Sequence, residues 1–232
     1  MALDFDGVDD QVNHGDIVGI DGAAAFTMMA WVNIDTLENL GFLMAKDGAC
    51  RLTMTTGPGT TMTAATTSVI TGDIAGAAVA GVWDHWAYVF DGAGAANADR
   101  LKLYKNGVNQ TLTFTGTVGA TLPDAGAEPF RVASNTSNTI FTDQKVAHLK
   151  LWTVAMTAAE VAQEMNSFRP VRTSGLIVWS PYDDGTNARD YSGNENHGVV
   201  TGALQAPGPP VSYGGQVRRW RRGSDQRLWR PA

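Results

Sequence analysis

Apolar and polar residues alternate with a period of two along much of the chain. Residues 26–34 place apolar side chains on one face, and residues 83–90 are rich in aromatic and β-branched types. Residues 100–105 alternate in the same way and run into an Asn-Gly pair. A period of two is typical of strands with one buried face, and both residues of Asn-Gly tolerate the positive φ of a type I′ turn. We therefore predict a β-hairpin over residues 100–114.

The same pattern predicts an all-β domain with one short helix. Further strands are expected at residues 3–6, 8–12, 40–46, 50–56, 60–70, 129–134, 145–152 and 175–180. A helix is expected at residues 158–165, because Thr157 and Glu160 have the spacing of a capping box. Proline and glycine cluster from Ala206, as in an extended linker. We predict one domain over residues 1–205 and a linker with a C-terminal arm over 206–232.

Charge divides the chain into an acidic body and a basic arm. The net charge is −6, and residues 211–232 hold six arginines against Asp225, so that residues 1–210 carry −11. Arginine and tryptophan together suit cation–π stacking and docking on an acidic surface. We predict that the arm docks on another subunit of an assembly or on a second copy of this chain. A solubilising tail and a nucleic-acid contact are alternatives, and no folded groove supports the latter. The predicted docking residues are Arg218, Arg219, Trp220, Arg221, Arg222 and Trp229.

The remaining bulk features favour a protein folded by burial alone. Cys50 is the single cysteine, so no internal disulfide can form, and we expect its side chain to fill the core. No window approaches the roughly 18 apolar residues of a membrane span. Neither a basic segment nor an apolar run precedes the first predicted strand. We therefore expect no signal peptide and synthesis in the cytoplasm.

Five segments, in this order, resemble the concanavalin A-like LamG/pentraxin jelly-roll family. They are Leu3 to Asp10, Phe26 to Val32, Trp83 to Gly92, Leu101 to Gly107, and Leu149 to Trp152 followed by Met156 to Glu160. The turn Asp190-Tyr-Ser-Gly-Asn194 is similar to one that commonly flanks such domains. The resemblance covers residues 2–205. It implies a jelly-roll sandwich of two antiparallel sheets packed face to face, which the alternating apolar positions also favour.

The fold does not by itself give an activity. Retaining glycosidases need two carboxylates about 5 Å apart, and the resemblance implies a Glu-x-Asp-x-x-Glu strand, which this chain lacks. The four histidines are scattered, with no catalytic or zinc-binding spacing. We therefore predict that the protein is not an enzyme, and that His85 has a structural role.

A calcium site is the most specific binding prediction. Asp4, Asp6, Asp9 and Asp10 lie around Gly7, and carboxylate oxygens are the ligands that Ca²⁺ prefers. The resemblance also implies calcium near the domain termini. The family's usual Asp-Glu before the strand leading to the helix is replaced by Ala147-His148, although Asp143 lies nearby. We predict Asp10 and Asp143 as ligands, the alternative being that these aspartates are solvated turn residues.

Other binding signals are weak. A second acidic loop is interpreted as a turn, and it holds Asp183, Asp184, Asn187 and Asp190. Sugar sites need exposed aromatic side chains, whereas the strand tryptophans match core positions; these are Trp31, Trp83, Trp86 and Trp152. The polar loop at residues 134–139 suits sugar hydroxyls but is equally an ordinary turn. The sequence alone therefore identifies no sugar site.

Taken together, we predict a non-catalytic structural or adhesion protein. Such leaderless sandwiches look like the surface proteins of bacteriophage particles, so we expect a virion-associated component that is held by its arm and can bind a cell-surface glycan. The alternative is a free, lectin-like carbohydrate-binding module that uses calcium.

Overall fold

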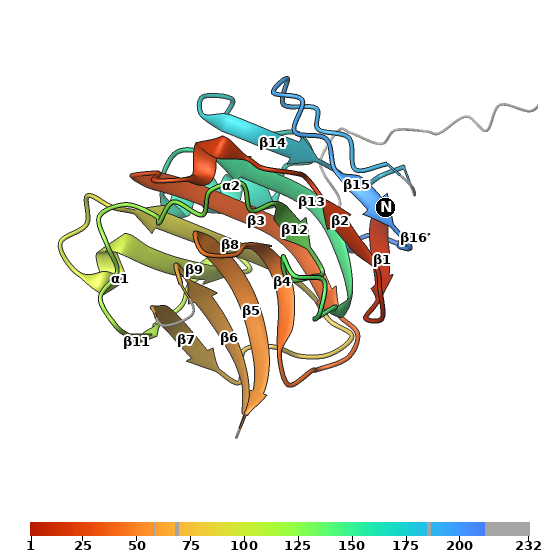
Figure 1. Ribbon diagram of the computed structural model, residues 1–232, viewed down its shortest axis with the longest axis horizontal. Helices are drawn as coiled ribbons and strands as arrows, with labels where there is room; N and C mark the ends of the chain where they lie inside the picture. The colour runs from red at the N-terminus through yellow and green to blue at the C-terminus, as the bar shows by residue number, and fades with distance from the viewer. Residues whose placement is uncertain (58, 68–69, 185–186, 212–232) are drawn as a thin grey trace, which may run out of the picture.

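Two antiparallel sheets packed face to face make up the protein. The computed structural model describes residues 1–57, 59–67, 70–184 and 187–211. The first sheet has the order β10-β9-β8-β3-β13-β1-β16, with β14 also paired to β13, and the second has the order β11-β7-β6-β5-β4-β12-β2-β15. Figure 1 shows the second sheet crossing in front of the first.

The bounds of the elements are as follows. The first sheet contains β1 (Ala2–Asp6), β3 (Ala25–Ile34), β8 (Trp83–Asp91), β9 (Leu101–Lys105), β10 (Val108–Asn109), β13 (Asp143–Trp152), β14 (Leu176–Ser180) and β16 (Leu204–Ala206). The second contains β2 (Gln11–Asn13), β4 (Gly41–Lys46), β5 (Cys50–Gly57), β6 (Gly59–Ala65), β7 (Thr71–Ala75), β11 (Thr113–Thr115), β12 (Phe130–Val132) and β15 (Val199–Thr201). The helices are α1 (Asn97–Arg100), α2 (Ala158–Met165) and a 3-10 turn at Val18–Ile20.

The two-sheet sandwich that the family resemblance implies, and that the alternation favours, is confirmed with local corrections. The Asn-Gly turn has φ values of 51° at Asn106 and 78° at Gly107, and it joins β9 to β10. The predicted hairpin over 100–114 is too long, because β11 pairs with β7 of the other sheet. The strand predicted at 60–70 is too long, since β6 ends at Ala65, the chain turns where the Thr66 N–H donates to the Ile70 carbonyl, and β7 begins at Thr71.

Several short elements were not predicted, among them β7 and the 3-10 turn. Strands β15 and β16 each have three residues, and α1 has four. Periodicity needs a longer window than that to be recognised. The pair of strands matters, because β15 belongs to one sheet and β16 to the other. Their connecting turn therefore joins the two sheets at the end of the molecule where β1 and β2 also lie (Figure 1).

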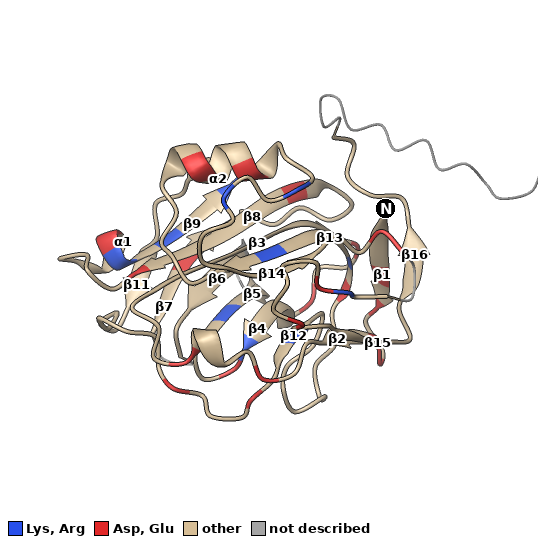
Figure 2. Cartoon of the chain, turned by 90° about the horizontal axis from the view of Figure 1, so that it is seen from above, with Lys and Arg blue, Asp and Glu red and all other residues tan. Residues whose placement is uncertain are grey.

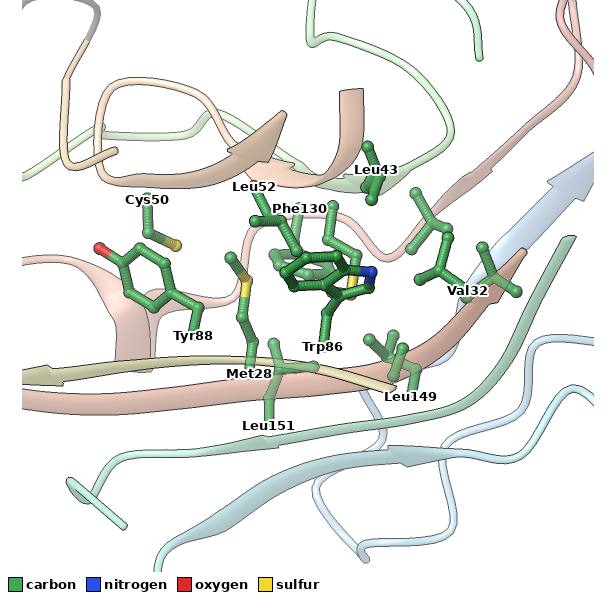
Figure 3. Close-up of a cluster of buried hydrophobic side chains, with 14 of the residues drawn as sticks. Met28, Val32, Leu43, Cys50, Leu52, Trp86, Tyr88, Phe130, Leu149 and Leu151 are labelled. Atoms are coloured by element: carbon green, nitrogen blue, oxygen red, sulfur yellow. The ribbon is translucent and has the colours of Figure 1, made fainter. Parts of the chain in front are cut away.

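The main core lies between the sheets. Figure 3 shows Trp86 at its centre, with Met28 and Leu149 from the first sheet and Leu52 and Phe130 from the second. Cys50 is buried in the same core, as predicted, and burial raises the pKa of its thiol to about 12. A thiol with this pKa stays protonated at neutral pH, so Cys50 acts as a packing residue.

Helix α2 covers the outer face of the first sheet. Its predicted capping box is present, since the Glu160 N–H donates to Thr157 Oγ1 and the Thr157 N–H donates to Glu160 Oε2. A second apolar cluster lies beneath it, made of Met29, Ala87, Val89, Tyr104, Trp152, Met156 and Val161. Strands β3, β8 and β13 are consequently buried on both faces. None of the helices within the described ranges is long and apolar enough to cross a membrane.

A buried ion pair fixes the end of α2 to the sheet. Lys150 and Glu164 are each 2% exposed, and Lys150 Nζ donates to Glu164 Oε2 at 2.8 Å and to the Ser167 carbonyl at 2.7 Å. Glu164 Oε1 accepts the N–H groups of Val171 and Arg172. All these polar groups satisfy one another, so the pair locks the helix and the following loop onto β13.

Replacing Lys150 by Met is expected to destabilise the fold by about 3–5 kcal/mol, because the Glu164 carboxylate then stays buried without its counter-charge. Urea denaturation followed by tryptophan fluorescence measures the loss. The double variant K150M/E164Q should recover part of it, since no charge remains buried. The exposed R169M serves as the control and should change stability by less than about 0.5 kcal/mol. A loss below 1 kcal/mol for K150M would show that the pair is not the anchor of α2.

Candidate functional site

An acidic pocket of about 520 Å³ lies at the end of the sandwich where the sheets are joined. Figure 2 shows acidic residues around β1 at this end. The pocket lies between the β1–β2 turn, the first residue of β13, the β3–β4 loop and the β15–β16 turn. It is lined by Asp4, Asp6, Asp10, Asp35, Asp143, Lys145, Gly202 and Leu204. Five carboxylates thus face one ammonium group.

The β1–β2 turn brings three carboxylates together. Asp6 Oδ1 accepts the Val8 N–H at 2.9 Å, and Asp10 Oδ2 accepts the Asp6 N–H at 3.0 Å. One oxygen from each of Asp6, Asp9 and Asp10 lies within 4.8 Å of the others. These hydrogen bonds close the turn on itself and bring the three carboxylates together; Asp6 and Asp10 line the pocket, and Asp9 lies beside them.

Two glycines allow the surrounding backbone to approach this group. A Cβ at Gly202 would lie 1.6 Å from Asp10 Oδ1, and a Cβ at Gly7 would lie 3.0 Å from the Asp143 backbone nitrogen. Both glycines have positive φ, at 72° and 75°. Any side chain at position 202 would fill the space that the Asp10 carboxylate occupies.

Asp143 lies in the same pocket but outside the group of three carboxylates. Its Oδ2 accepts the Thr36 hydroxyl at 2.6 Å, and its N–H donates to Glu38 Oε1 at 3.1 Å. It also pairs directly with Asp6 in the β1–β13 ladder. The structure therefore brings Asp10 and Asp143, the two predicted ligands, to one pocket, while the closest partners of Asp10 are Asp6 and Asp9.

Crowding of like charges sets the electrostatics of the pocket. Burial raises the pKa of Asp10, and the carboxylates of Asp6, Asp9 and Asp4 raise it further against the opposing effect of the Asp6 N–H. Burial and Asp143 likewise raise the pKa of Glu38. The opposing cation is Lys145, which pairs with Asp35 and, at 3.4 Å, with Asp4. A negative charge in this pocket is thus only partly compensated.

The donor set suits a hard divalent cation. All donors of Asp6, Asp9 and Asp10 are carboxylate oxygens, which is the ligand type of Ca²⁺. The space kept open by Gly202 lets the carboxylate stand at the pocket edge rather than turn into solvent. The residues present therefore fit calcium.

The second acidic loop is structural, as interpreted from the sequence. The Asp190 carboxylate accepts the N–H groups of Trp179, Ser192 and Asn196 and the hydroxyl of Ser192. Four donors occupy its two oxygens, so it closes the turn between β14 and β15. The predicted docking residues, Arg218, Arg219, Trp220, Arg221, Arg222 and Trp229, lie outside the described residues.

The buried histidines are held neutral. Burial lowers the pKa of His14 to about 4 and that of His85 to about 3. His14 contacts the Asn196 carbonyl at 2.9 Å and the Tyr182 hydroxyl at 3.0 Å, and the ring of His85 packs on Trp31. Burial also lowers the pKa of His148 to about 3. A histidine with such a pKa accepts protons poorly at neutral pH, which fits packing better than acid–base chemistry.

Sequence reasoning missed several parts of the pocket. Asp35 and Glu38 follow β3, and Gly202 forms the turn between two strands too short to be recognised. The feature that these residues share is their position in the fold, because all of them lie in turns at the same end of the sandwich. The exposed Tyr191 was also missed. It is carried by the Asp190-Tyr-Ser-Gly-Asn194 turn, which was read only as a motif.

Replacing Asp10 by Asn is expected to raise the melting temperature of the cation-free protein by a few degrees at neutral pH. The pKa of Asp10 is higher in the folded protein than in the unfolded chain. Ionisation of Asp10 therefore lowers the free energy of unfolding as pH rises through the folded-state pKa. It has no effect below the unfolded-state pKa of about 3.9. The difference between D10N and the parent should therefore shrink to zero as pH falls toward about 4. Thermal unfolding in chelator from pH 4 to pH 8 measures it. D124N, on an exposed turn, is the control. A D10N protein that is less stable at pH 7 would contradict the repulsion.

The comparisons with known proteins agree with the fold. Residues 6–162 match the model of the concanavalin A-like lectin/glucanases superfamily. No curated protein matches the chain. A candidate carbohydrate-binding protein from Bacteroides ovatus superposes with a TM-score of 0.65 at 16% identity, over 91% of this chain and 61% of that one. The chain thus spans less than two thirds of that structure.

Two further structures are more distant. A pentraxin from Limulus polyphemus gives a TM-score of 0.41 at 13% identity, over 69% of this chain and 79% of that one. Domain 4 of an extracellular arabinanase from Geobacillus stearothermophilus, solved with arabinotriose, gives 0.43 at 20% identity, over 63% and 68%. At these identities the structural likeness concerns the fold, whereas the family match covers more than half of the sequence. The chain belongs to the concanavalin A-like lectin/glucanases superfamily.

Proposed function

We propose that this protein is a non-catalytic carbohydrate-binding domain that uses a calcium ion held by Asp6, Asp9 and Asp10. The observation that carries the proposal is the pocket of about 520 Å³ in which five carboxylates face a single ammonium. A bound cation would neutralise that charge and offer its open coordination positions to sugar hydroxyls. Asp143, on the same pocket, would supply a further oxygen to the ion or to the sugar.

The chemistry favours binding over hydrolysis. A retaining hydrolase needs one carboxyl group to donate a proton and another to act as nucleophile, on opposite sides of the bond. Here Asp6, Asp9 and Asp10 all belong to the single β1–β2 turn, each with an oxygen within 4.8 Å of the others, so they can reach one ion but do not flank a substrate from two sides. The similarity to the Bacteroides ovatus structure, itself described as a candidate carbohydrate-binding protein, supports the same class of function.

We further propose that the domain serves adhesion, displayed on a larger assembly such as a bacteriophage particle and recognising a cell-surface glycan. The composition of the arm supports this, since six arginines and two tryptophans follow an acidic body. These side chains would dock on an acidic subunit or on a second copy of the chain. A free lectin-like module is the alternative, and it makes no use of the arm.

Calcium is expected to bind the parent protein and to raise its melting temperature, because only the folded pocket holds the ligands. D10N should weaken calcium binding at least tenfold, since it removes a charged ligand. Isothermal titration with CaCl₂ measures the affinity, and a glycan array in CaCl₂ and in EDTA shows whether sugar binding needs the ion. D124N again provides the control. Sugar binding that is equal in both buffers would overturn the role of calcium, and no glycan binding at all would overturn the proposed function.

Exchanging Arg218, Arg219, Arg221 and Arg222 for Ser is expected to abolish assembly while leaving the domain folded. The native mass, by light scattering after size exclusion, should fall to that of one chain. For the parent it should exceed one chain at low salt and decrease at high salt, since exposed charges are screened. R169S, on the body, is the control. Equal masses for the parent and the arm variant would exclude self-assembly through these arginines.

A further inference from the structure

A row of aromatic rings crosses the outer side of β13 and β14 and ends in solvent. The ring centroids are 5.2 Å apart for His148 and Phe168, 6.0 Å for Phe168 and Trp179, and 5.7 Å for Trp179 and Tyr191. Tyr191 is 49% exposed and is the single aromatic residue among the exposed large apolar side chains of the described ranges. The row therefore ends in one exposed ring, Tyr191, which Trp179 contacts directly, with the rings of Phe168 and His148 further behind.

Hydrogen bonds hold this ring in place. The Tyr191 N–H donates to the Trp179 carbonyl at 2.8 Å, and the Trp179 N–H donates to Asp190 Oδ1 at 2.8 Å. Asp190 also accepts the N–H of Ser192, so both neighbours of Tyr191 in the chain are fixed. The backbone that carries the ring is therefore fixed before a ligand binds, so binding does not pay to order it.

The turn that carries the ring also carries two polar side chains suited to hydroxyls. The Arg189 guanidinium lies 5.5 Å from the centroid of the Tyr191 ring, and the side chain is exposed. The amide nitrogen of the exposed Asn194 donates to the Leu176 carbonyl and to Ser192 Oγ, both at 2.9 Å, which leaves its carbonyl oxygen as an acceptor. The same turn thus offers an aromatic ring, the hydrogen-bond donors of a guanidinium and the acceptor oxygen of a side-chain amide.

We propose that Tyr191, Trp179 and Arg189 form a second contact surface that binds a pyranose unit of a glycan. The C–H face of the sugar packs on the exposed part of the Tyr191 ring, which Trp179 supports, and its hydroxyls accept hydrogen bonds from Arg189. The surface needs no cation and lies on different elements from the acidic pocket. It rests on the proposed function and adds a site to it.

The size of the surface favours a sugar over a protein partner. A stable protein interface buries roughly 800 Å² on each side and uses several exposed anchors. Here one exposed ring is flanked by one guanidinium and one amide. A single pyranose unit matches this surface, because one of its faces can pack on the aromatic ring while its hydroxyls hydrogen-bond to the guanidinium and the amide.

The test uses the full chain and defined oligosaccharides. Cellohexaose, mannohexaose and chitohexaose are titrated calorimetrically into the parent, Y191F, Y191A, R189Q and D10N, in CaCl₂ and in EDTA, with furanose arabinohexaose as the comparison sugar. We expect at least one pyranose hexasaccharide to bind in EDTA. Y191A should weaken it about tenfold or more and R189Q severalfold, whereas Y191F should stay within about twofold because it keeps the ring.

Each other outcome decides against the surface. If a pyranose oligosaccharide binds the parent, and Y191A binds it with an affinity within twofold of the parent's, the proposed surface is wrong. If D10N then loses that binding, the proposed function still stands. If only arabinohexaose binds, the surface is likewise wrong and the proposed function survives. If Y191A changes the native mass instead of the sugar affinity, the ring is a protein contact. If no oligosaccharide binds in either buffer, both proposals fall.

Discussion

Strand β13 has two edges but pairs with three strands, and this constraint places both candidate binding surfaces. One edge pairs with β3, and the other pairs with β1 over residues 143–146 and with β14 over residues 149–152. The exchange of partners occurs at His148, which has a φ of 57° and whose N–H donates to the Pro181 carbonyl. A bulge of this kind redirects a strand at the cost of regular pairing.

Each half of β13 consequently serves a different site. Its first half carries Asp143 into the acidic pocket beside β1. Its second half carries Lys150, whose ion pair with Glu164 fixes α2, and it holds β14, from which Trp179 supports Tyr191. The family's usual acidic pair is replaced here by Ala147-His148. The residue that departs from the family pattern is therefore the one at which the strand changes partners.

The pocket stores electrostatic repulsion that the rest of the fold must offset. Burial of apolar surface between the sheets supplies that stability, and the buried histidines and Lys150 are each neutral or paired. In the part of the chain that the structure describes, the pocket beside β1 gathers five carboxylates with one counter-charge. Native proteins accept such local cost mainly where a ligand relieves it.

The sandwich could be predicted from the sequence because burial on one face imposes a period of two on long strands such as β3, β8 and β13. Residue types alone pointed to Asp10, which lies in a turn rich in aspartate, whereas Asp143 was named from the family resemblance, and the role of both as ligands stays a prediction. Sequence reasoning could not find Gly202 or Tyr191, whose importance depends on which turns meet in space. Nor could it find where the strand predicted at 60–70 ends, at Ala65, because threonine and alanine fit strand and turn alike.

The outermost ladder of the first sheet has a mechanical consequence. Strands β1 and β16 are antiparallel neighbours joined over three residue pairs, and Ala2 lies directly opposite Ala206. A pulling force applied at these two positions acts across the ladder, so its hydrogen bonds break one after another rather than all together in shear. The first structure to open would be the strand that carries Leu204, with the Gly202 turn behind it, and both line the acidic pocket. An adhesion domain loaded through these two ends would release its ligand under tension before its core unfolds.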